Sequence, residues 1–195
     1  MDLQTIDTYN KTASVYDDET DSFWKRFPRT FLDKFISLSG DNIVDIGSGP
    51  GRDGLLLQEA GKSVVCIDAS KEMVASYTSR GLSSLVGNFE HLPWTDLSFD
   101  GVWSYTALLH VPKASIATPL KEIHRVLKPS GVFALGLIEG DTEGYKVEDG
   151  NRRWFSFYQP AEVITLAAQL GFTLVYFETF RPRSKNYFNF IFQRN

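Results

Sequence analysis

Short apolar stretches alternate with amphipathic ones through the middle of the chain, from Gly40 to Gly136. The apolar stretches have the length of buried strands, which predicts strands over 42–46, 63–67, 99–104 and 131–137, with a shorter one over 83–86. The spacing of apolar residues between them predicts helices over 55–59, 73–77 and 116–127. Strands that alternate with helices are typical of a parallel sheet covered on both faces, so the sequence predicts an α/β fold.

The segments that flank this alternation are more polar. Residues 8–24 combine polar and aromatic side chains and helical spacing follows over 29–38, so we expect a flap and a docking helix within residues 1–38. Acidic residues and glycines are concentrated in 140–150, which predicts an exposed loop inside a substrate-covering insertion over 140–159. The remaining pattern predicts a helix over 160–170 and two strands over 172–180 and 187–193.

Composition narrows the class of protein. The chain has 195 residues, of which 43% are hydrophobic, so it can bury one sizeable core and we expect a single domain over 1–195. The formal charge of −4 argues against nucleic acid as a partner. Cys66 is the one cysteine and the polar N-terminus lacks the pattern of a signal peptide, so we expect a cytoplasmic protein that does not enter a membrane. No spacing of Cys, His and carboxylates predicts a metal site.

A glycine-rich loop follows the first predicted strand. Gly47, Gly49 and Gly51 alternate with other residues directly after the strand that contains Asp45. Glycine has no Cβ and adopts backbone angles closed to other residues, so a ligand can lie against bare main chain. The free amides at the start of the following helix face the same place. The pattern predicts a site for an adenosyl-bearing ligand, although a tight turn from strand to helix requires glycine even without a ligand.

Asp68 ends the second predicted strand, about twenty positions past Gly49. This spacing is expected when a βαβ unit brings a carboxylate to the two hydroxyls of a ribose, because two carboxylate oxygens suit a vicinal diol. The alternative is that Asp68 caps the helix that begins near Ser70.

Five segments resemble, in order along the chain, the motifs of the class I S-adenosylmethionine-dependent methyltransferases, and of their small-molecule group often labelled methyltransferase type 11. They are 44–51, 66–73, 87–93, 98–104 and 120–131. The resemblance implies a Rossmann-like, doubly wound sheet of seven strands, mostly parallel, with the last strand antiparallel and helices on both faces. It also implies an enzyme that transfers the methyl group of S-adenosylmethionine to a small-molecule acceptor and releases S-adenosylhomocysteine.

The same resemblance implies a set of cofactor-binding residues. The glycines approach the methionyl and ribose portions, Asp68 holds the ribose hydroxyls, and Met73 packs near the adenine. Tyr9 and Tyr16 cover the methionyl end, where ring faces suit a sulfonium; the alternative for this pair is an apolar helical stripe that packs on the core. Asn88 stands where relatives commonly have Asp. The full set is Tyr9, Tyr16, Asp45, Gly47, Ser48, Gly49, Gly51, Asp68, Ala69, Ser70, Met73, Asn88, Phe89 and Ser104.

The segments that would face the acceptor also contain candidate residues. His110 and Tyr105 are the candidate catalytic residues. An imidazole takes a proton near neutral pH, so His110 is a candidate general base; the alternative is a structural histidine whose ring nitrogens bond the local backbone. The candidate acceptor-binding residues are Arg152, Trp154 and Tyr158, which would suit an anionic molecule. Alternatively, the rings of this segment pack into the core and its arginines pair with the acidic loop.

Two other functions are compatible with a glycine loop and a ribose carboxylate. One is an NAD-dependent oxidoreductase, but the dinucleotide fingerprint Gly-X-Gly-X-X-Gly fits the loop less well than alternating glycines do. The other is a non-catalytic protein that keeps the fold and binds S-adenosylmethionine as a scaffold. The five ordered motifs favour methyl transfer over the oxidoreductase, whereas turnover separates the enzyme from the scaffold.

Overall fold

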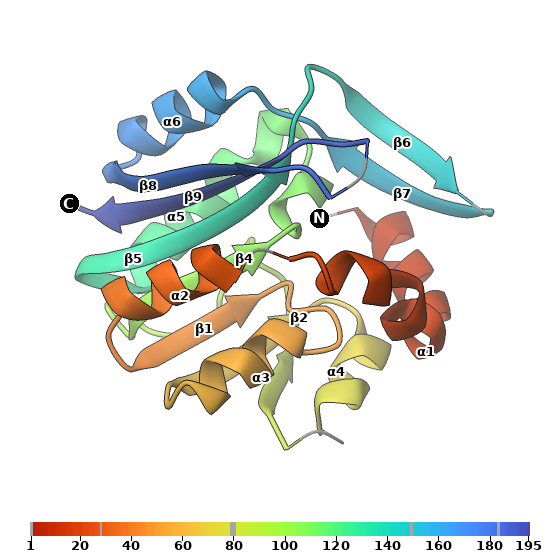
Figure 1. Cartoon of the computed structure of the whole chain (residues 1–195), viewed down its shortest axis with the longest axis horizontal. Coiled ribbons are helices and arrows are strands. Elements are labelled where there is room, and N and C mark those ends of the chain that lie inside the picture. Colours follow the sequence, from red (N-terminus) through yellow and green to blue (C-terminus); the bar gives the residue numbers. More distant parts are fainter. Residues whose placement is uncertain (1, 28, 79–80, 149, 183) are drawn as a thin grey trace.

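Seven strands form the central sheet of the computed structural model, which describes residues 2–27, 29–78, 81–148, 150–182 and 184–195 (Figure 1). They are β1 (Asn42–Ile46), β2 (Ser63–Asp68), β3 (Ser83–Val86), β4 (Phe99–Tyr105), β5 (Leu127–Ile138), β8 (Phe172–Phe180) and β9 (Tyr187–Arg194). Their order is β3-β2-β1-β4-β5-β9-β8. Neighbouring strands run parallel except at β9, which is antiparallel to both β5 and β8. The mostly parallel sheet with an antiparallel last strand is therefore confirmed.

Helices cover both faces of this sheet (Figure 1). They are α1 (Leu3–Trp24), α2 (Arg29–Leu38), α3 (Arg52–Glu59), α4 (Lys71–Thr78), α5 (Ala117–Val126) and α6 (Pro160–Gln169). Side chains of α2 and α3 join one apolar cluster, and those of α5 and α6 join another on the opposite face. α1 and α4 pack against each other beside β2. In the described part of the chain, no helix is both long and apolar enough to span a membrane.

Alternate residues of the central strands face opposite layers, as the period of two along a strand requires. In β1, Ile43 belongs to the cluster under α2 and α3, whereas its neighbour Val44 belongs to the cluster under α5 and α6. Val132 and Phe133 of β5 divide in the same way. The continuous apolar runs in these strands therefore reflect burial on both sides.

The expected loop over 140–150 is wrong for most of its length. β6 (Glu143–Glu148) pairs antiparallel with β7 (Asn151–Ser156) in a separate two-stranded hairpin, which Figure 1 shows at the same end of the sheet as α1. Most of β6 is exposed, so its polar residues have the composition of a loop. Tyr145 and Val147 nevertheless alternate with charged residues, which is the period of a strand.

The expected flap is part of one continuous helix, α1, which begins at Leu3. Two threonines join this helix to β7. The backbone N–H of Trp154 donates to Thr5 Oγ1 at 2.8 Å, and Thr8 Oγ1 donates to the carbonyl of Arg152 at 2.8 Å. The helix and the hairpin therefore cover the same end of the sheet as a hydrogen-bonded unit.

The strand that follows α5 begins earlier than expected, at Leu127 rather than at residue 131. Its pairing with β4 shifts between Phe99 and Gly101. Ser130 lies in this irregular part with a φ of 62°, a conformation that favours glycine. The turn residues therefore form an irregular start to β5 that bends the chain from the helix into the sheet.

Truncation of Phe133 tests this account of the core. Its ring is buried, with its centroid 5.8 Å from that of Phe172 and 6.3 Å from that of Phe192. We expect Phe133→Ala to lower the free energy of unfolding by about 3–5 kcal/mol in urea titrations, because it removes apolar contacts and leaves a cavity. The control Val175→Ala changes an exposed position of β8 and should cost less than about 0.5 kcal/mol. Equal losses in the two variants would contradict the account.

Candidate functional site

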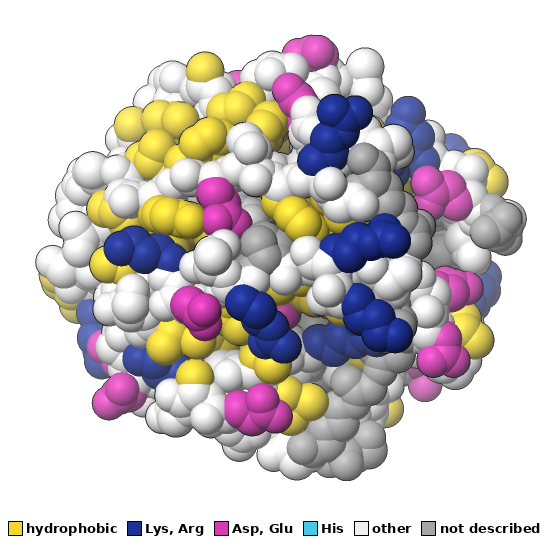
Figure 2. Space-filling model, viewed as in Figure 1, with side chains coloured by type: hydrophobic (Ala, Val, Ile, Leu, Met, Phe, Trp, Pro, Cys, Tyr) yellow, Lys and Arg dark blue, Asp and Glu magenta, His cyan; other side chains and the backbone are white. Residues whose placement is uncertain are grey.

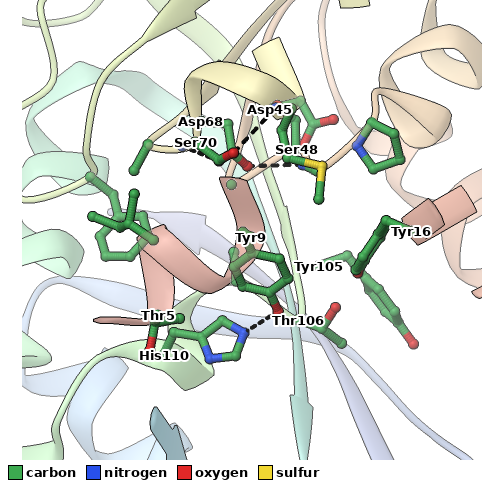
Figure 3. A pocket seen from close by; sticks show the side chains of 18 of the residues that line it. Thr5, Tyr9, Tyr16, Asp45, Ser48, Asp68, Ser70, Tyr105, Thr106 and His110 are labelled. Atoms are coloured by element: carbon green, nitrogen blue, oxygen red, sulfur yellow. Dashed lines mark hydrogen bonds between the residues drawn. The ribbon is translucent and has the colours of Figure 1, made fainter. Parts of the chain in front are cut away.

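A cavity opens at the ends of β1, β2 and β4, against α1 (Figure 3). The carboxyl ends of parallel strands meet at one edge of a sheet, and open α/β sheets generally bind ligands there. The structure brings together around this first cavity most of the cofactor residues predicted from the sequence. They are Tyr9, Tyr16, Asp45, Gly47, Ser48, Gly49, Asp68, Ala69, Ser70, Met73 and Phe89.

The glycine loop is shaped by close packing as well as by backbone conformation. Gly47 and Gly49 have φ values of 65° and 53°, in the left-handed region. A Cβ on Gly47 would lie 2.2 Å from the Cβ of Ala107, closer than such atoms approach. The N–H of Gly47 donates to the carbonyl of Ile67 at 2.8 Å, which ties the loop to β2. Glycine is therefore required by the turn itself, and the same turn presents bare main chain to the cavity.

Asp68 faces the first cavity and fixes two backbone segments beside it. Its Oδ2 accepts from the N–H of Gly49 at 3.0 Å and its Oδ1 from the N–H of Ser70 at 2.8 Å. The cap of α4 is Ser70, whose Oγ accepts from the N–H of Met73 at 3.2 Å. Burial raises the pKa of Asp68 to about 6. Ser70 rather than Asp68 therefore caps α4, and the Asp68 carboxylate keeps lone pairs for a ligand.

Two further buried carboxylates, those of Asp45 and Asp53, face the same cavity. The indole N–H of Trp103 donates to Asp53 Oδ2 at 2.7 Å. Asp45 Oδ2 and Asp53 Oδ1 are buried and have no hydrogen-bond partner among the residues that the structure describes. Burial raises the pKa of Asp53 to about 7, and burial together with the neighbouring carboxylates raises that of Asp45 well above its ordinary range. The sequence motifs do not single out Asp53; its one signal is an acidic residue in the first turn after the loop.

α1 supplies aromatic side chains to the wall of the cavity. The rings of Tyr9 and Tyr16 lie edge to face with centroids 5.8 Å apart. Both rings also pack on the cluster around Met73, so the pair lines the cavity and packs on the core at once. Ser70 Oγ donates to Asn10 Oδ1 at 2.8 Å, which joins α1 to the start of α4.

His110 is held by both ring nitrogens. Nδ1 lies 2.5 Å from the carbonyl oxygen of Trp154, which can only accept, so Nδ1 carries a proton. Nε2 lies 2.7 Å from the hydroxyl of Tyr9 and accepts from it in the neutral ring (Figure 3). Burial lowers the pKa of His110 to about 4. The ring is therefore neutral near pH 7 with its lone pair engaged, which fits the structural alternative better than a general base.

A second cavity, of about 390 Å³, adjoins the first. The residues that line both are Tyr9, Tyr16, Trp24, Thr106 and His110. Thr106 has a φ of 55°, and a β-branched residue in this conformation is strained. Such strain is concentrated at functional sites, although no sequence motif indicates it here. The five shared residues define the junction of the two cavities.

The residues predicted to bind the acceptor lie beside this second cavity rather than in its wall. The guanidinium of Arg152 is on the exposed side of the hairpin, 3.9 Å from the centroid of the Tyr145 ring. Trp154 donates from its indole to Ser156 Oγ at 3.0 Å, and Tyr158 is buried. Arg153 and Phe155, on the other face of β7, line the cavity instead. The one sequence signal for this difference is the period of two along a strand, which places Arg152 and Arg153 on opposite faces of β7.

Of the other predicted residues, Tyr105 is in the wall of the first cavity, whereas Gly51, Asn88 and Ser104 are not. Gly51 is the N-cap of α3, with a φ of 82°. Asn88 Oδ1 accepts from the N–H groups of the two residues at 90 and 91, at 2.9 and 3.2 Å. Ser104 Oγ donates to the carbonyl of Ile46 at 3.1 Å. Tyr105 lines the cavity, and its buried hydroxyl has no partner in the described part of the chain.

Comparison with known proteins shows which family and which relatives the chain is similar to. The family profile described as "Methyltransferase domain" matches residues 44–135. The chain is 35% identical over 113 residues to the ubiquinone/menaquinone biosynthesis C-methyltransferase of Rubrivivax gelatinosus, which covers 56% of this chain and 43% of that protein. It is 27% identical over 175 residues to the malonyl-(acyl-carrier protein) O-methyltransferase of Dechloromonas aromatica, over 86% of this chain and 65% of that protein. The chain thus spans less than two thirds of either relative's length.

A solved structure shares the fold. The 1,6-didemethyltoxoflavin-N1-methyltransferase of Burkholderia thailandensis, with bound 1,6-didemethyltoxoflavin and S-adenosylhomocysteine, has a TM-score of 0.74 to this chain. The two chains are 20% identical, and the match covers 96% of this chain and 87% of that one.

The strand order, the glycine loop and the cavity at the strand ends define a Rossmann-like, nucleotide-binding class of protein. The family match and the curated relatives narrow this class, because both are methyltransferases. Residues 44–135 therefore match the methyltransferase-domain family, and the chain resembles the class I S-adenosylmethionine-dependent methyltransferases in sequence and fold.

The buried Asp53 predicts a distinctive pH dependence of stability. Its pKa is raised by burial to about 7, against about 3.9 in an unfolded chain. The folded state holds the proton more tightly, so the group lowers stability as the pH rises from about 4 to 7. In Asp53→Asn, the asparagine side chain cannot ionise but still accepts from Trp103. We expect this substitution to stabilise the ligand-free protein at about pH 8, and its gain in the free energy of unfolding there should exceed the gain at about pH 5 by at least about 1 kcal/mol. Urea titrations with equal effects at both pH values would contradict this.

The bonding of His110 predicts one tautomer over a wide pH range. Nitrogen-15 NMR of the histidine-labelled protein should show His110 with a protonated Nδ1 and no titration above about pH 5, because burial lowers its pKa to about 4. Tyr9→Phe removes the hydroxyl from Nε2, so it should shift the Nε2 resonance and leave the tautomer unchanged. A titration midpoint of about 6.5, the ordinary value for histidine, would contradict this account.

Proposed function

We propose that the chain binds S-adenosylmethionine in the first cavity and transfers its methyl group to a small molecule in the second. The observation that carries the proposal is the junction of the two cavities at Tyr9, Thr106 and His110. In-line displacement requires donor and acceptor to meet at one point with water kept out. A cofactor cavity that shares a wall with a second cavity of suitable size meets that requirement.

The residues around the first cavity fit this molecule. The ammonium of its methionyl group would satisfy the carboxylate oxygens of Asp45 and Asp53 that lack a partner, and its positive charge would favour their ionised form. Asp68 would accept from the ribose hydroxyls, because each of its oxygens can accept more than the N–H it already holds. Met73 and Phe89, both buried, provide apolar surface for an adenine.

S-adenosylmethionine supplies, when bound, a methyl group already activated by its sulfonium. The protein therefore has mainly to align the reactants and exclude water, which contributes about 7–11 kcal/mol in favourable cases. The rings of Tyr9 and Tyr16 attract a cation in the cavity, by about 0.5–2 kcal/mol. α1 holds these rings in place through the bond of Asn10 to Ser70 and through its bonds to β7.

We propose positioning roles for both catalytic candidates. The bonds of His110 to the carbonyl of Trp154 and to the hydroxyl of Tyr9 fix the Tyr9 ring at the junction. Burial raises the pKa of Tyr105, so its hydroxyl stays protonated at neutral pH. The ring of Tyr105 stacks on that of Trp103, with centroids 6.2 Å apart, and shapes the wall of the first cavity.

A small molecule fits the second cavity better than a nucleic acid does. The cavity measures about 390 Å³, and aromatic side chains make up much of its wall. On the face shown in Figure 2, several Lys and Arg side chains lie near one another right of the centre, with Asp and Glu side chains to either side of them. A formal charge of −4 gives no general attraction for phosphates.

Calorimetry with S-adenosylhomocysteine tests the first cavity. We expect Asp68→Ala to weaken binding by about 10- to 100-fold, because it removes the acceptor of two ribose hydrogen bonds. The control Asp41→Asn, at a side chain that is 87% exposed, should leave the affinity unchanged. Affinity should also fall below about pH 6, where Asp68 takes up a proton because burial raises its pKa.

Several results would contradict the proposal. Equal affinities in the Asp68 and Asp41 variants would remove the proposed ribose site. Binding of NAD in place of S-adenosylhomocysteine would favour an oxidoreductase. Tight binding without methyl transfer to any acceptor would support a non-catalytic scaffold instead.

A further inference from the structure

Arg153 places a guanidinium in the wall of the second cavity. The alternation of β7 turns it toward the cavity together with Phe155, and its side chain is 20% exposed. Its guanidinium carbon lies 5.5 Å from the centroid of the Tyr9 ring and 5.4 Å from that of Phe155. Because Tyr9 belongs to the junction, the positive charge stands beside the point where the two cavities meet.

The hydrogen bonding of this guanidinium is incomplete. Nη2 pairs with Glu148 Oε2 at 3.1 Å, and Nη1 lies 3.4 Å from the hydroxyl of Tyr9. Nε is buried without a hydrogen-bond partner among the residues that the structure describes. A buried donor without a hydrogen-bond partner costs about 1–3 kcal/mol of stability. An anionic oxygen that accepted a hydrogen bond from this Nε–H would offset that cost. Lys185 lies 3.9 Å from the same Glu148, so two cations share one carboxylate here.

Among the described residues that line both cavities, none offers a base ready to take a proton from an acceptor at the junction. The Nε2 lone pair of His110 is engaged by Tyr9. Glu148 is paired with the cations, and Glu19 is exposed on α1. An acceptor that enters this cavity therefore needs a lone pair that is already available.

Aromatic side chains form part of the rest of the wall, beside polar ones. Its aromatic side chains are Tyr9, Tyr16, Phe23, Trp24, Phe155 and Tyr187. Aromatic side chains favour contact with other aromatic groups, which they meet by stacking or edge to face. The cavity therefore combines a surface for an aromatic ring with one cation at the junction.

These observations, together with the methyl transfer proposed above, lead us to propose that the acceptor is a small aromatic acid, bound in its ionised form with an oxygen on Arg153. The acid is methylated on its ionised oxygen. A lone pair of that oxygen forms the new C–O bond, while the S–CH3 bond breaks and its electron pair stays on sulfur. The anion and the sulfonium become a neutral methyl ester or ether and a neutral thioether, so no proton is released and no base is required.

Three naphthalene probes test the charge requirement. 2-Naphthoate, 2-naphthamide and 2-naphthylmethylamine share one ring system and carry a negative, a neutral and a positive group. In fluorescence titrations of the complex with S-adenosylhomocysteine, we expect 2-naphthoate to bind at least about tenfold more tightly than the other two. Equal or tighter binding of the amide or the amine overturns the proposal, as does a failure of 2-naphthoate to bind.

Two neighbouring arginines provide a matched pair of variants. Arg153→Gln should weaken 2-naphthoate binding by about tenfold or more and leave the affinity for S-adenosylhomocysteine within about twofold. Arg152→Gln, on the opposite face of β7, should leave both affinities within about twofold. Equal losses in the two variants, or no loss in Arg153→Gln, overturn the proposal. If circular dichroism shows that Arg153→Gln is unfolded, Arg153→Lys replaces it. Lysine keeps the positive charge but lacks the planar guanidinium, so we expect a smaller loss of affinity for 2-naphthoate.

Failure of the proposed cofactor site has a different signature, because the wild-type protein would then not bind S-adenosylhomocysteine. In that case the probes are titrated into the protein alone. Binding of 2-naphthoate that depends on Arg153 would still support the anion site, and its absence would overturn it.

Discussion

Three carboxylates around one cavity, those of the buried Asp45 and Asp53 and of the half-buried Asp68, set the electrostatics on which the rest of the site depends. Burial raises the pKa of each, since an ionised carboxylate loses hydration inside the protein. Asp68 recovers part of the loss through the N–H groups of Gly49 and Ser70, whereas the other two keep oxygens without a partner in the described structure. Ionisation of these groups in the ligand-free protein therefore costs stability, and a cationic ligand with hydrogen-bond donors would offset that cost.

The sheet and the elements outside it divide the work of the proposed enzyme. The strand ends and the glycine loop form the first cavity, and α1 and the β6–β7 hairpin complete the second. Hydrogen bonds from Thr5 and Thr8 to β7 hold these outer elements together, and Tyr9 connects them to His110 at the junction. The acceptor can therefore differ between proteins of this fold through α1 and the hairpin, while the sheet stays the same.

The sheet could be predicted because its central strands are buried on both faces and read as apolar runs bounded by turns. The position of Asp68 followed from the length of one βαβ unit. The hairpin was missed because β6 is exposed and its polar residues have the composition of a loop. The sequence placed two arginines in this segment but could not show that Arg153 rather than Arg152 faces the cavity, because the face to which a residue of β7 turns depends on pairing with β6 and on contact with α1. The buried state of Asp53 depends on Trp103 from β4, a contact that no local pattern contains.

A crystal structure of the chain with S-adenosylhomocysteine tests the central claim most directly. The account predicts ribose hydroxyls on Asp68, the amino group beside Asp45 and Asp53, and the sulfur directed at the junction between Tyr9 and Thr106. A ligand whose sulfur points away from the second cavity, or whose amino group lies far from the two buried carboxylates, would contradict it.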